Sequence, residues 1–212
     1  MTGPIPTLDI NLRRLVLATH NPHKVREILA ILGSLPYEVL TAADFPNLPE
    51  PEETGSTLAE NAIIKARALN AGTGVWALAD DSGLEIDSLG GAPGVISARF
   101  AGPDCTFADN NSKVLRLMEG IPVGQRIARF RCVAALAMED GRLEVFDGVT
   151  EGVITFHTSG EAGFGYDPIF FSPELGCTFA QASDEAKNRV SHRGRAFQQV
   201  ARRLRLLAGQ TG

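Results

Sequence analysis

The feature that most constrains the fold of this chain is an alternation of short apolar runs with segments of helical periodicity. The run RLVLAT at 14–19 stops at an Asn-Pro turn, and a helix is predicted over 23–32. Its expected inward residues are Val25, Ile28, Leu29 and Leu32. A second run at 37–42 precedes a proline-rich acidic loop, and Thr57 then opens a helix to about residue 71 with a capping box. Strands that alternate with helices are typical of α/β proteins.

The second half of the sequence adds strands that are joined by a tight turn. Residues 127–138 and 142–149 have strand character on either side of MEDGRL. We therefore expect an α/β fold with an elongated mixed β-sheet flanked by helices. The chain has no repeat and no obvious linker, so the expected single domain spans 1–212, with 1–12 outside its ordered part. The further elements predicted are helices at 107–119, 183–189 and 193–208 and a short strand at IFF.

Composition excludes several classes of protein. The three cysteines are widely spaced and form no CxxC pair, which argues against a disulfide framework or a zinc site and favours a reducing cytoplasm. The sequence contains no long apolar run and no secretory leader pattern, so neither a membrane segment nor export is expected. A net charge of −5 disfavours a general nucleic-acid binder. The basic residues after position 200 are interpreted as the solvated face of a terminal helix. Its expected inward residues are Phe197, Val200, Ala201, Leu204 and Leu207.

Two adjacent aspartates, in the stretch WALADDSGLEID, raise the main chemical question. Asp80 and Asp81 follow an apolar run, and two like charges at the end of a buried strand need exposure, a shared proton or a cation. An exposed turn is the simple alternative, and a divalent cation is the functional one. Mg²⁺ takes one or two carboxylates and completes its shell with water and phosphate, so Glu53 is a natural second ligand. Helix capping is the alternative role for Glu53.

Three other loops carry complementary polar groups. In ATHNPHK, Thr19, Asn21 and Lys24 lie where a strand gives way to a helix, which suits an anion, although a plain Asn-Pro turn is the alternative. The segment GFGYDP supplies aromatic rings that can stack on a nucleobase, and KNRVSHRG supplies cations for phosphate or a ring carbonyl. Each ring also fits a core position, and His192 also fits a helix cap. Together these loops describe a nucleoside polyphosphate site.

Competing catalytic interpretations have less support. Ser82 does not lie in a GxSxG elbow, and the chain has only four histidines, which disfavours a serine triad. A second enzymatic hypothesis is a house-cleaning pyrophosphatase for other modified nucleotides, such as methylated pyrimidines.

A hypothesis from another class is a nucleotide- or RNA-binding protein without catalysis. Acidic residues near phosphate weigh against pure binding, because without a metal they repel the ligand.

The order of the motifs resembles one family. LVLATHNPHK, EETGSTLAENAIIKA, LADDSGLEIDSLGGAPGVISARF, GFGYDPIF and SHRGRA occur in the order seen in the Ham1/RdgB-like inosine/xanthosine triphosphate pyrophosphatases, from about residue 15 to 197. The resemblance implies Mg²⁺-dependent hydrolysis of ITP, dITP and XTP to the monophosphate and pyrophosphate. It also implies a homodimer and an elongated sheet whose two lobes enclose a central active-site cleft.

The resemblance also assigns roles to residues. Asp81 would be the catalytic carboxylate and would share Mg²⁺ with Glu53, while Asp80 would support it with its charge partly offset by the metal. Lys65 would assist the triphosphate, and Ser82 would bind substrate. The first loop would hold the triphosphate through Thr19, His20, Asn21, Pro22, His23 and Lys24. The nucleoside pocket would comprise Phe164, Gly165, Tyr166, Asp167, Lys187, His192 and Arg193.

The chain departs from the family pattern in that first loop. Bacterial members often have TGNxGK, whereas His20 and His23 stand here at the two glycine positions, with Pro22 between them. Loss of glycine removes backbone conformations with positive φ, so the sequence does not determine how this loop would contact phosphate. The simple interpretation is that the two histidine side chains point outward. In the pocket, cationic donors would pair with the 6-carbonyl of hypoxanthine or xanthine and confront the amino group of adenine.

Overall fold

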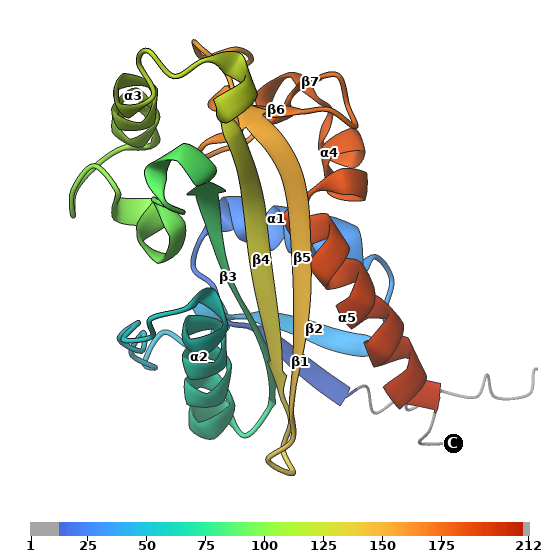
Figure 1. Ribbon diagram of the computed structural model, residues 1–212. Helices are drawn as coiled ribbons and strands as arrows, with labels where there is room; N and C mark the ends of the chain where they lie inside the picture. The colour runs from blue at the N-terminus through green and yellow to red at the C-terminus, as the bar shows by residue number, and fades with distance from the viewer. Residues whose placement is uncertain (1–12, 210–212) are drawn as a thin grey trace, which may run out of the picture.

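A computed structural model describes residues 13–209, and within them the strands form one seven-stranded sheet in the order β2-β1-β3-β4-β5-β6-β7 (Figure 1). β1 runs parallel to β2 and to β3, and all the other pairings are antiparallel. The sheet is therefore mixed, as the sequence predicts. The strands are β1 (Arg13–Leu17), β2 (Tyr37–Thr41), β3 (Trp76–Ile86), β4 (Ile127–Ala137), β5 (Leu143–Ile154), β6 (Phe170–Ser172) and β7 (Cys177–Thr178).

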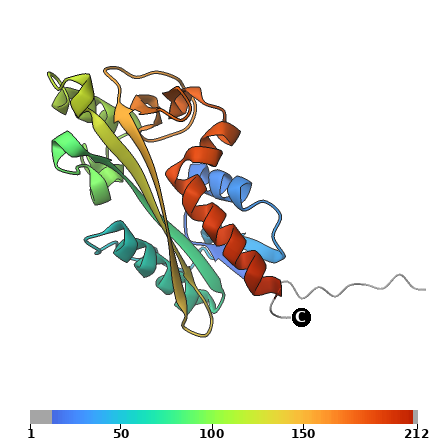
Figure 2. The same ribbon diagram turned by 45° about the vertical axis from the view of Figure 1, so that its right-hand side comes forward.

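Helices cover both faces of the sheet. α2 packs on one face, and α1 and α5 pack on the other, as the two views in Figures 1 and 2 show. The alternation of side chains along β4 explains this, because Ala134 and Leu136 join the cluster with α1 and α5, whereas Val133 and Ala135 join the cluster with α2. The helices are α1 (Pro22–Leu32), α2 (Leu58–Thr73), α3 (Phe107–Leu117), α4 (Asp184–Val190) and α5 (His192–Gly209).

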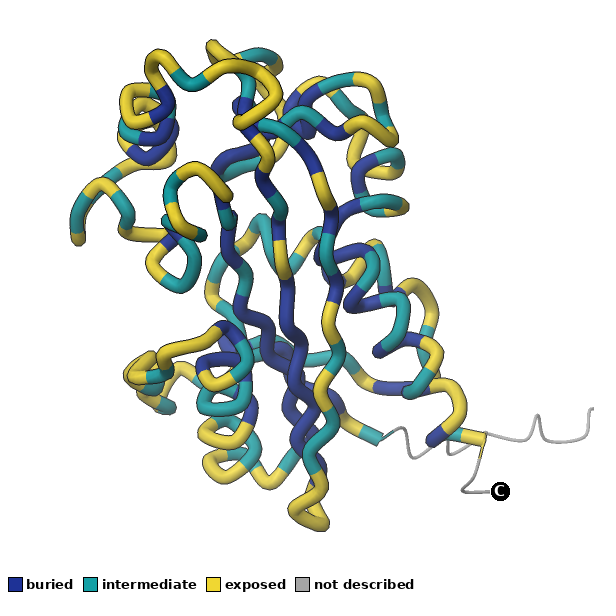
Figure 3. Tube along the Cα trace, in the orientation of Figure 1, coloured by how far each residue is buried: buried dark blue, intermediate teal, exposed yellow. Residues whose placement is uncertain are grey.

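A separate hydrophobic cluster fills the other end of the elongated molecule. It gathers Leu84 and Ile86 of β3, Phe130 of β4 and the aromatic rings of Phe170 and Phe179. β3 and β4 therefore run through both ends, and they are buried along most of their length, whereas the tip of the β4–β5 hairpin is exposed (Figure 3). This arrangement gives the molecule two lobes on a shared set of strands.

The structure differs from the sequence prediction at the aspartates. Asp80 and Asp81 do not end a strand: β3 continues through them to Ile86, with Asp80 opposite Ala134 and Asp81 opposite Val133 in β4. The expectation of a strand end was wrong because the charge of Asp80 is met by cations from α1 and α5, which no local pattern reveals. β5 likewise extends beyond the predicted 142–149, to Ile154.

The terminal helix agrees with its predicted pattern. Its five expected inward residues, Phe197, Val200, Ala201, Leu204 and Leu207, are all buried. Between residues 13 and 209 no helix is long and apolar enough to cross a membrane. The prediction for residues 1–12 lies outside the described residues. In α1 the helical spacing predicted Leu29 to face inward, but its side chain is 42% exposed, because the helix packs through Ile28 and Leu32 instead.

Candidate active site

A polar cleft of about 280 Å³ lies where the two lobes meet. Its walls come from the turn after β1, from α2, from the middle of β3, from the loop before β6 and from the junction of α4 and α5. Segments far apart in the sequence thus converge on one concave surface, where binding sites usually form. The sequence-predicted site residues that line it are Thr19, His20, Asn21, Lys24, Glu53, Lys65, Asp81, Ser82, Phe164, Gly165, Tyr166, Asp167, Lys187, His192 and Arg193.

Asp80 lies beneath the cleft as a buried anion that is paired through one of its two oxygens, since Oδ1 has no partner among the described residues. Its Oδ2 is 3.1 Å from Lys24 Nζ and 3.0 Å from an Nη of Arg193, and the Ser82 hydroxyl donates to the same oxygen. Burial alone would raise the pKa of Asp80, but Lys24, Arg193 and Lys65 hold it far below its usual range. The family resemblance implies that a metal would offset part of this charge. In the structure two cations, Lys24 and Arg193, also pair with Asp80 and tie β3 to α1 and α5.

Asp81 has the opposite environment. Its side chain points to the α2 side, where Oδ1 is 3.0 Å from Lys65 Nζ and Oδ2 accepts a long hydrogen bond of 3.4 Å from the Asn61 amide. Burial raises the pKa of Asp81, and the charges of Lys65 and Lys24 offset this only in part. A carboxylate with a raised pKa in a cleft is a better proton acceptor than an ordinary aspartate.

Lys65 holds the two proposed metal ligands together. Its Nζ is 3.0 Å from Glu53 Oε1 and 3.0 Å from Asp81 Oδ1, so both carboxylates point at one cationic atom. Burial would lower the pKa of Lys65, but these acids and Asp80 raise it, and the ammonium stays charged. The carboxylates therefore converge on a position that accepts positive charge.

This pair of acids fits Mg²⁺ chemically. Both are hard oxygen donors, and Mg²⁺ commonly binds one or two carboxylates and completes its shell with water and substrate phosphate. In the described part of the chain no group of three or more His, Cys, Asp or Glu side chains could hold a metal. A dedicated protein cage for a metal is therefore absent between residues 13 and 209, and two carboxylates are what the cleft offers.

The loop before α1 is organised as a helix cap. Asn21 accepts hydrogen bonds from the amides of His23 and Lys24, at 2.9 and 3.4 Å, and its own amide donates to the Thr19 hydroxyl. These three amides already have acceptors, so the open anion cradle expected from the sequence is filled by side chains. The cleft lining, taken over residues 13–209, leaves out Pro22 and His23, although both were predicted to bind substrate.

At the other end of the cleft, a glycine-rich loop presents an aromatic ring. Phe164 lies between Gly163 and Gly165, both with positive φ, and its amide donates to Asp167 Oδ2 at 2.8 Å. Tyr166 is buried in the core, and its hydroxyl donates to the Ser97 carbonyl. Of the two rings expected to stack on a base, Phe164 is therefore the accessible one, while Tyr166 is a core residue that forms part of the wall.

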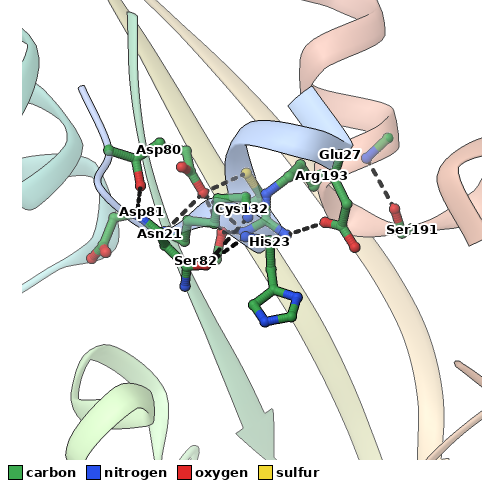
Figure 4. Close-up of polar contacts among 12 residues, drawn as sticks. Asn21, His23, Glu27, Asp80, Asp81, Ser82, Cys132, Ser191 and Arg193 are labelled. Atoms are coloured by element: carbon green, nitrogen blue, oxygen red, sulfur yellow. Dashed lines mark hydrogen bonds and ion pairs between the residues drawn. The ribbon is translucent and has the colours of Figure 1, made fainter. Parts of the chain in front are cut away.

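The cations expected in the nucleoside pocket are buried in an ion-pair network. Lys187 Nζ lies 2.5 Å from Asp167 and 2.7 Å from Glu27. Glu27 also accepts a hydrogen bond of 2.7 Å from Arg193, as Figure 4 shows. Burial alone would raise the pKa of Glu27, but Arg193 and Lys187 lower it. These ion pairs leave Arg193 Nε as a buried atom without a partner among the described residues. Arg193 Nε is therefore a buried donor whose hydrogen-bonding capacity no described residue uses.

Among the described residues that line the cleft, His192 is the other one with a buried, unpartnered polar atom. Its ring stacks on Phe130, with centroids 4.6 Å apart and planes 12° apart, and Nδ1 has no partner in the described part of the chain. Burial, with the charges of Arg193 and Lys187, lowers the pKa of His192 well below its usual value, so the imidazole stays neutral. His192 is not the cap of α5. The Ser191 hydroxyl has that role, because it accepts a hydrogen bond from the Gly194 amide in the first turn.

The sequence interpretation missed Phe107, which lines the cleft, and several residues that support the lining from behind. Glu27 lies three residues after Lys24, a spacing that places both on one face of α1 and that could have revealed it. No local sequence pattern could have identified Asn61 or Phe107. Asn61 contacts Asp81 and Phe107 contacts Phe164, and both contacts join residues that are distant in the sequence. Asn111 of α3 donates to the Gly165 carbonyl at 3.0 Å and so supports the aromatic loop from the second lobe.

Comparison with known proteins agrees with this arrangement. The Ham1 family model matches residues 15–203. The dITP/XTP pyrophosphatase of Desulforamulus reducens is 51% identical over 187 residues, which cover 88% of this chain and 93% of that protein. The enzyme of the same name from Geobacter sulfurreducens is 50% identical over 184 residues, 87% and 92% of the two chains.

Solved structures show the same fold. A HAM1 protein from Coxiella burnetii superposes with a TM-score of 0.84 and 43% identity, over 91% of this chain and 98% of that one. The Staphylococcus aureus Ham1 protein superposes with a TM-score of 0.82 and 37% identity, over 93% and 100%. The family match runs from before the first cleft residue, Ala18, to beyond the last, Arg193.

Proposed function

The chain belongs to the Ham1 family, and from this membership and the chemistry of its cleft we propose that it hydrolyses non-canonical purine nucleoside triphosphates. The substrates are ITP, dITP and XTP, and the products are the nucleoside monophosphate and pyrophosphate. Relatives named dITP/XTP pyrophosphatases, about half identical over most of the chain, support this assignment. The activity would remove deaminated purines from the nucleotide pool.

One observation carries the proposal. A single cleft joins two carboxylates that converge on Lys65 to buried, unpartnered nitrogens of Arg193 and His192. The first group suits a metal-bound phosphate chain, and the second suits a base with ring carbonyls. A protein that only bound nucleic acid would have no use for the acidic pair beside phosphate.

The roles of the residues follow from their environments. We propose that Asp81 takes a proton from the water that attacks the α-phosphorus, since its raised pKa makes it the more basic of the paired aspartates. Glu53 and Asp81 would hold Mg²⁺, which when bound supplies charge neutralisation for the phosphates and a more acidic water. Lys65 would turn from the two carboxylates to the phosphate chain. Lys24, through its ion pair with Asp80, would keep a cation beside that chain.

Base selection would depend on donors that adenine does not match. Arg193 Nε is a donor, and the neutral imidazole of His192 can also donate through one nitrogen. Hypoxanthine and xanthine present a carbonyl at C6, whereas adenine presents an amino group. Adenine would therefore leave buried donors unpaired, which is a strong source of discrimination. Phe164 would contact the face of the base.

We also propose that the protein is a homodimer, a property that the family resemblance implies. Sedimentation velocity at micromolar concentration would give the mass in solution. A species of twice 22.6 kDa is expected, and a monomer at all concentrations would contradict this part of the proposal.

The decisive experiment is pyrophosphate release from ITP, XTP, GTP and ATP, with Mg²⁺ and with EDTA. We expect rapid cleavage of ITP and XTP, at least a hundredfold preference over ATP, and no activity in EDTA. Asp81→Asn should lower kcat by a factor of about 100 or more, because it removes the proton acceptor and a metal ligand. Equal turnover of ATP would contradict the substrate assignment.

A matched control is available on the hairpin. Asp140 is an exposed carboxylate that pairs with Arg142, and it does not line the cleft within the described part of the chain. Asp140→Asn makes the same chemical change as Asp81→Asn and should leave kcat unchanged. Activity on methylated pyrimidine triphosphates in place of ITP would favour the alternative house-cleaning role.

A further inference from the structure

Phe164 is held on several sides, although it lies at the tip of a loop. Its ring centroid is 5.2 Å from the His23 ring, 6.1 Å from the Phe107 ring and 5.1 Å from Lys187 Nζ. These partners come from α1, α3 and α4. Hydrogen bonds from the Phe164 amide to Asp167 and from Asn111 to the Gly165 carbonyl hold the loop backbone, and the ring contacts add to the positioning of the side chain.

Among these contacts, the one with His23 is a stack. The two rings are inclined by only 25°, and in Figure 4 the imidazole projects away from the ion pair of Glu27 with Arg193. Arg26, one turn further along α1, lies with an Nη 2.9 Å from His23 Nδ1. Because arginine only donates, Nδ1 is the acceptor in this contact. The imidazole is therefore fixed in orientation by its own helix before it meets Phe164.

His23 supports the ring from outside the cleft. Phe164 lines the cleft and His23 does not, within residues 13–209. The backbone amide of His23 is also engaged, since it donates to Asn21 in the cap of α1. Neither the amide nor the imidazole is thus directed at a phosphate chain. A glycine, which the family pattern places here, would leave this face of Phe164 uncovered.

We infer that His23 is a positioning residue of the nucleobase subsite, acting through Phe164, and is not a ligand of the triphosphate. The inference rests on the proposed function, because it takes Phe164 as the ring that meets the base. It assigns a purpose to the histidine that departs from the family pattern in the first loop. It also links that loop to the base end of the cleft, so that two segments expected to act on different parts of the substrate form one unit.

The two reaction products separate the two ends of the cleft. Inosine monophosphate carries the base, and pyrophosphate carries only the phosphate chain. We would measure the Kd of each by calorimetry in the presence of Mg²⁺, for wild type, His23→Ala and His23→Phe. An aromatic stack of this kind corresponds to about a 3- to 10-fold change in affinity.

The expected result is a split between the ligands. His23→Ala should weaken the binding of inosine monophosphate about 3- to 10-fold and leave the Kd of pyrophosphate unchanged. His23→Phe, which keeps a ring, should retain the wild-type affinity for inosine monophosphate. His157→Ala is the matched control, because His157 is an exposed histidine that does not line the cleft within residues 13–209. It should change neither Kd.

Three results would overturn the inference. An equal loss of affinity for both ligands in His23→Ala would show that His23 acts on the phosphate chain. No change in either Kd would show that the stack does not influence the base. Loss of affinity in His23→Phe equal to that in His23→Ala would exclude an aromatic role. If the wild-type protein neither bound inosine monophosphate nor cleaved ITP, the proposed function itself would fail, which is a separate outcome.

Discussion

Asp80 and Asp81 are neighbours in β3 whose side chains lie on opposite faces of the sheet, and their pKa values move in opposite directions. Asp80 meets Lys24 and Arg193 and stays ionised, whereas Asp81 meets one partly shared ammonium and is destabilised as an anion. Two carboxylates with different environments can serve different roles. Here one holds the cleft together and the other is available for chemistry.

This difference predicts opposite effects of the same substitution. Asp80→Asn removes one charge of a buried ion-pair network and should lower the free energy of unfolding by about 3–5 kcal/mol. Asp81→Asn should leave it unchanged or raise it. The raised pKa of Asp81 means that the folded state binds this proton more tightly than the unfolded state does, so at neutral pH the ionised group costs stability.

Urea unfolding at pH 7 would measure both variants against wild type. The activity assay on the same samples separates the roles, because Asp81→Asn should be folded and inactive. A large loss of stability in Asp81→Asn would show that its contact with Lys65 is mainly structural.

His192 predicts how stability depends on pH. Its folded-state pKa lies well below the unfolded value of 6.5, so the unfolded state binds the extra proton as the pH falls through 6.5. Stability from the neutral imidazole is therefore complete above pH 6.5 and is lost below it, by up to about 1.4 kcal/mol per pH unit. Denaturant unfolding between pH 7.5 and 5 should show this decline, and His192→Gln should flatten it. An unchanged slope in His192→Gln would assign the decline to other groups.

At the scale of elements, the junction of α4 and α5 depends on the close approach of α5 to β5. A Cβ added at Gly148 of β5 would lie 2.1 Å from the carbonyl oxygen of His192 and 2.6 Å from the amide of Ala196. Both contacts are with backbone, so α5 itself would have to move. Since the first turn of α5 carries His192 and Arg193, this single glycine positions the base end of the cleft.

Gly148→Ala is therefore expected to act on two properties at once. Displacement of α5 should lower the free energy of unfolding by about 1–3 kcal/mol, as at other overpacked sites. It should also raise KM for ITP. Gly124→Ala is the matched control, because a Cβ there meets nothing within 4 Å. It should change neither the melting temperature nor KM. If Gly148→Ala behaved like the control, α5 would have room that the structure does not show.

Some elements could be predicted from the sequence alone and others could not. The α2 helix could be predicted from its capping box and α5 from its apolar spacing, because both signals are local. The course of β3 through the aspartates could not, since the partners of Asp80 come from residues 24 and 193. The contact of His23 with Phe164 joins residues 141 positions apart, and no pattern within one segment encodes it.

At the scale of the whole molecule, the strands beneath the cleft belong to both lobes. β3 supplies Leu78 to the core under α1 and α5, Ala79 to the core under α2, and Leu84 to the core of the other lobe. β4 also contributes to all three clusters. Either lobe could therefore unfold alone only by breaking strands that stabilise the other.

This continuity predicts a single cooperative unfolding transition, although the chain is longer than most two-state domains. Trp76, the only tryptophan, is buried in the core with α1 and α5, so its fluorescence reports one lobe, whereas far-UV circular dichroism reports all elements. The two thermal curves should coincide, and the calorimetric and van't Hoff enthalpies should agree. Circular dichroism that fell before the Trp76 signal would show the lobe with α3 unfolding first, and the prediction of one domain would then be wrong.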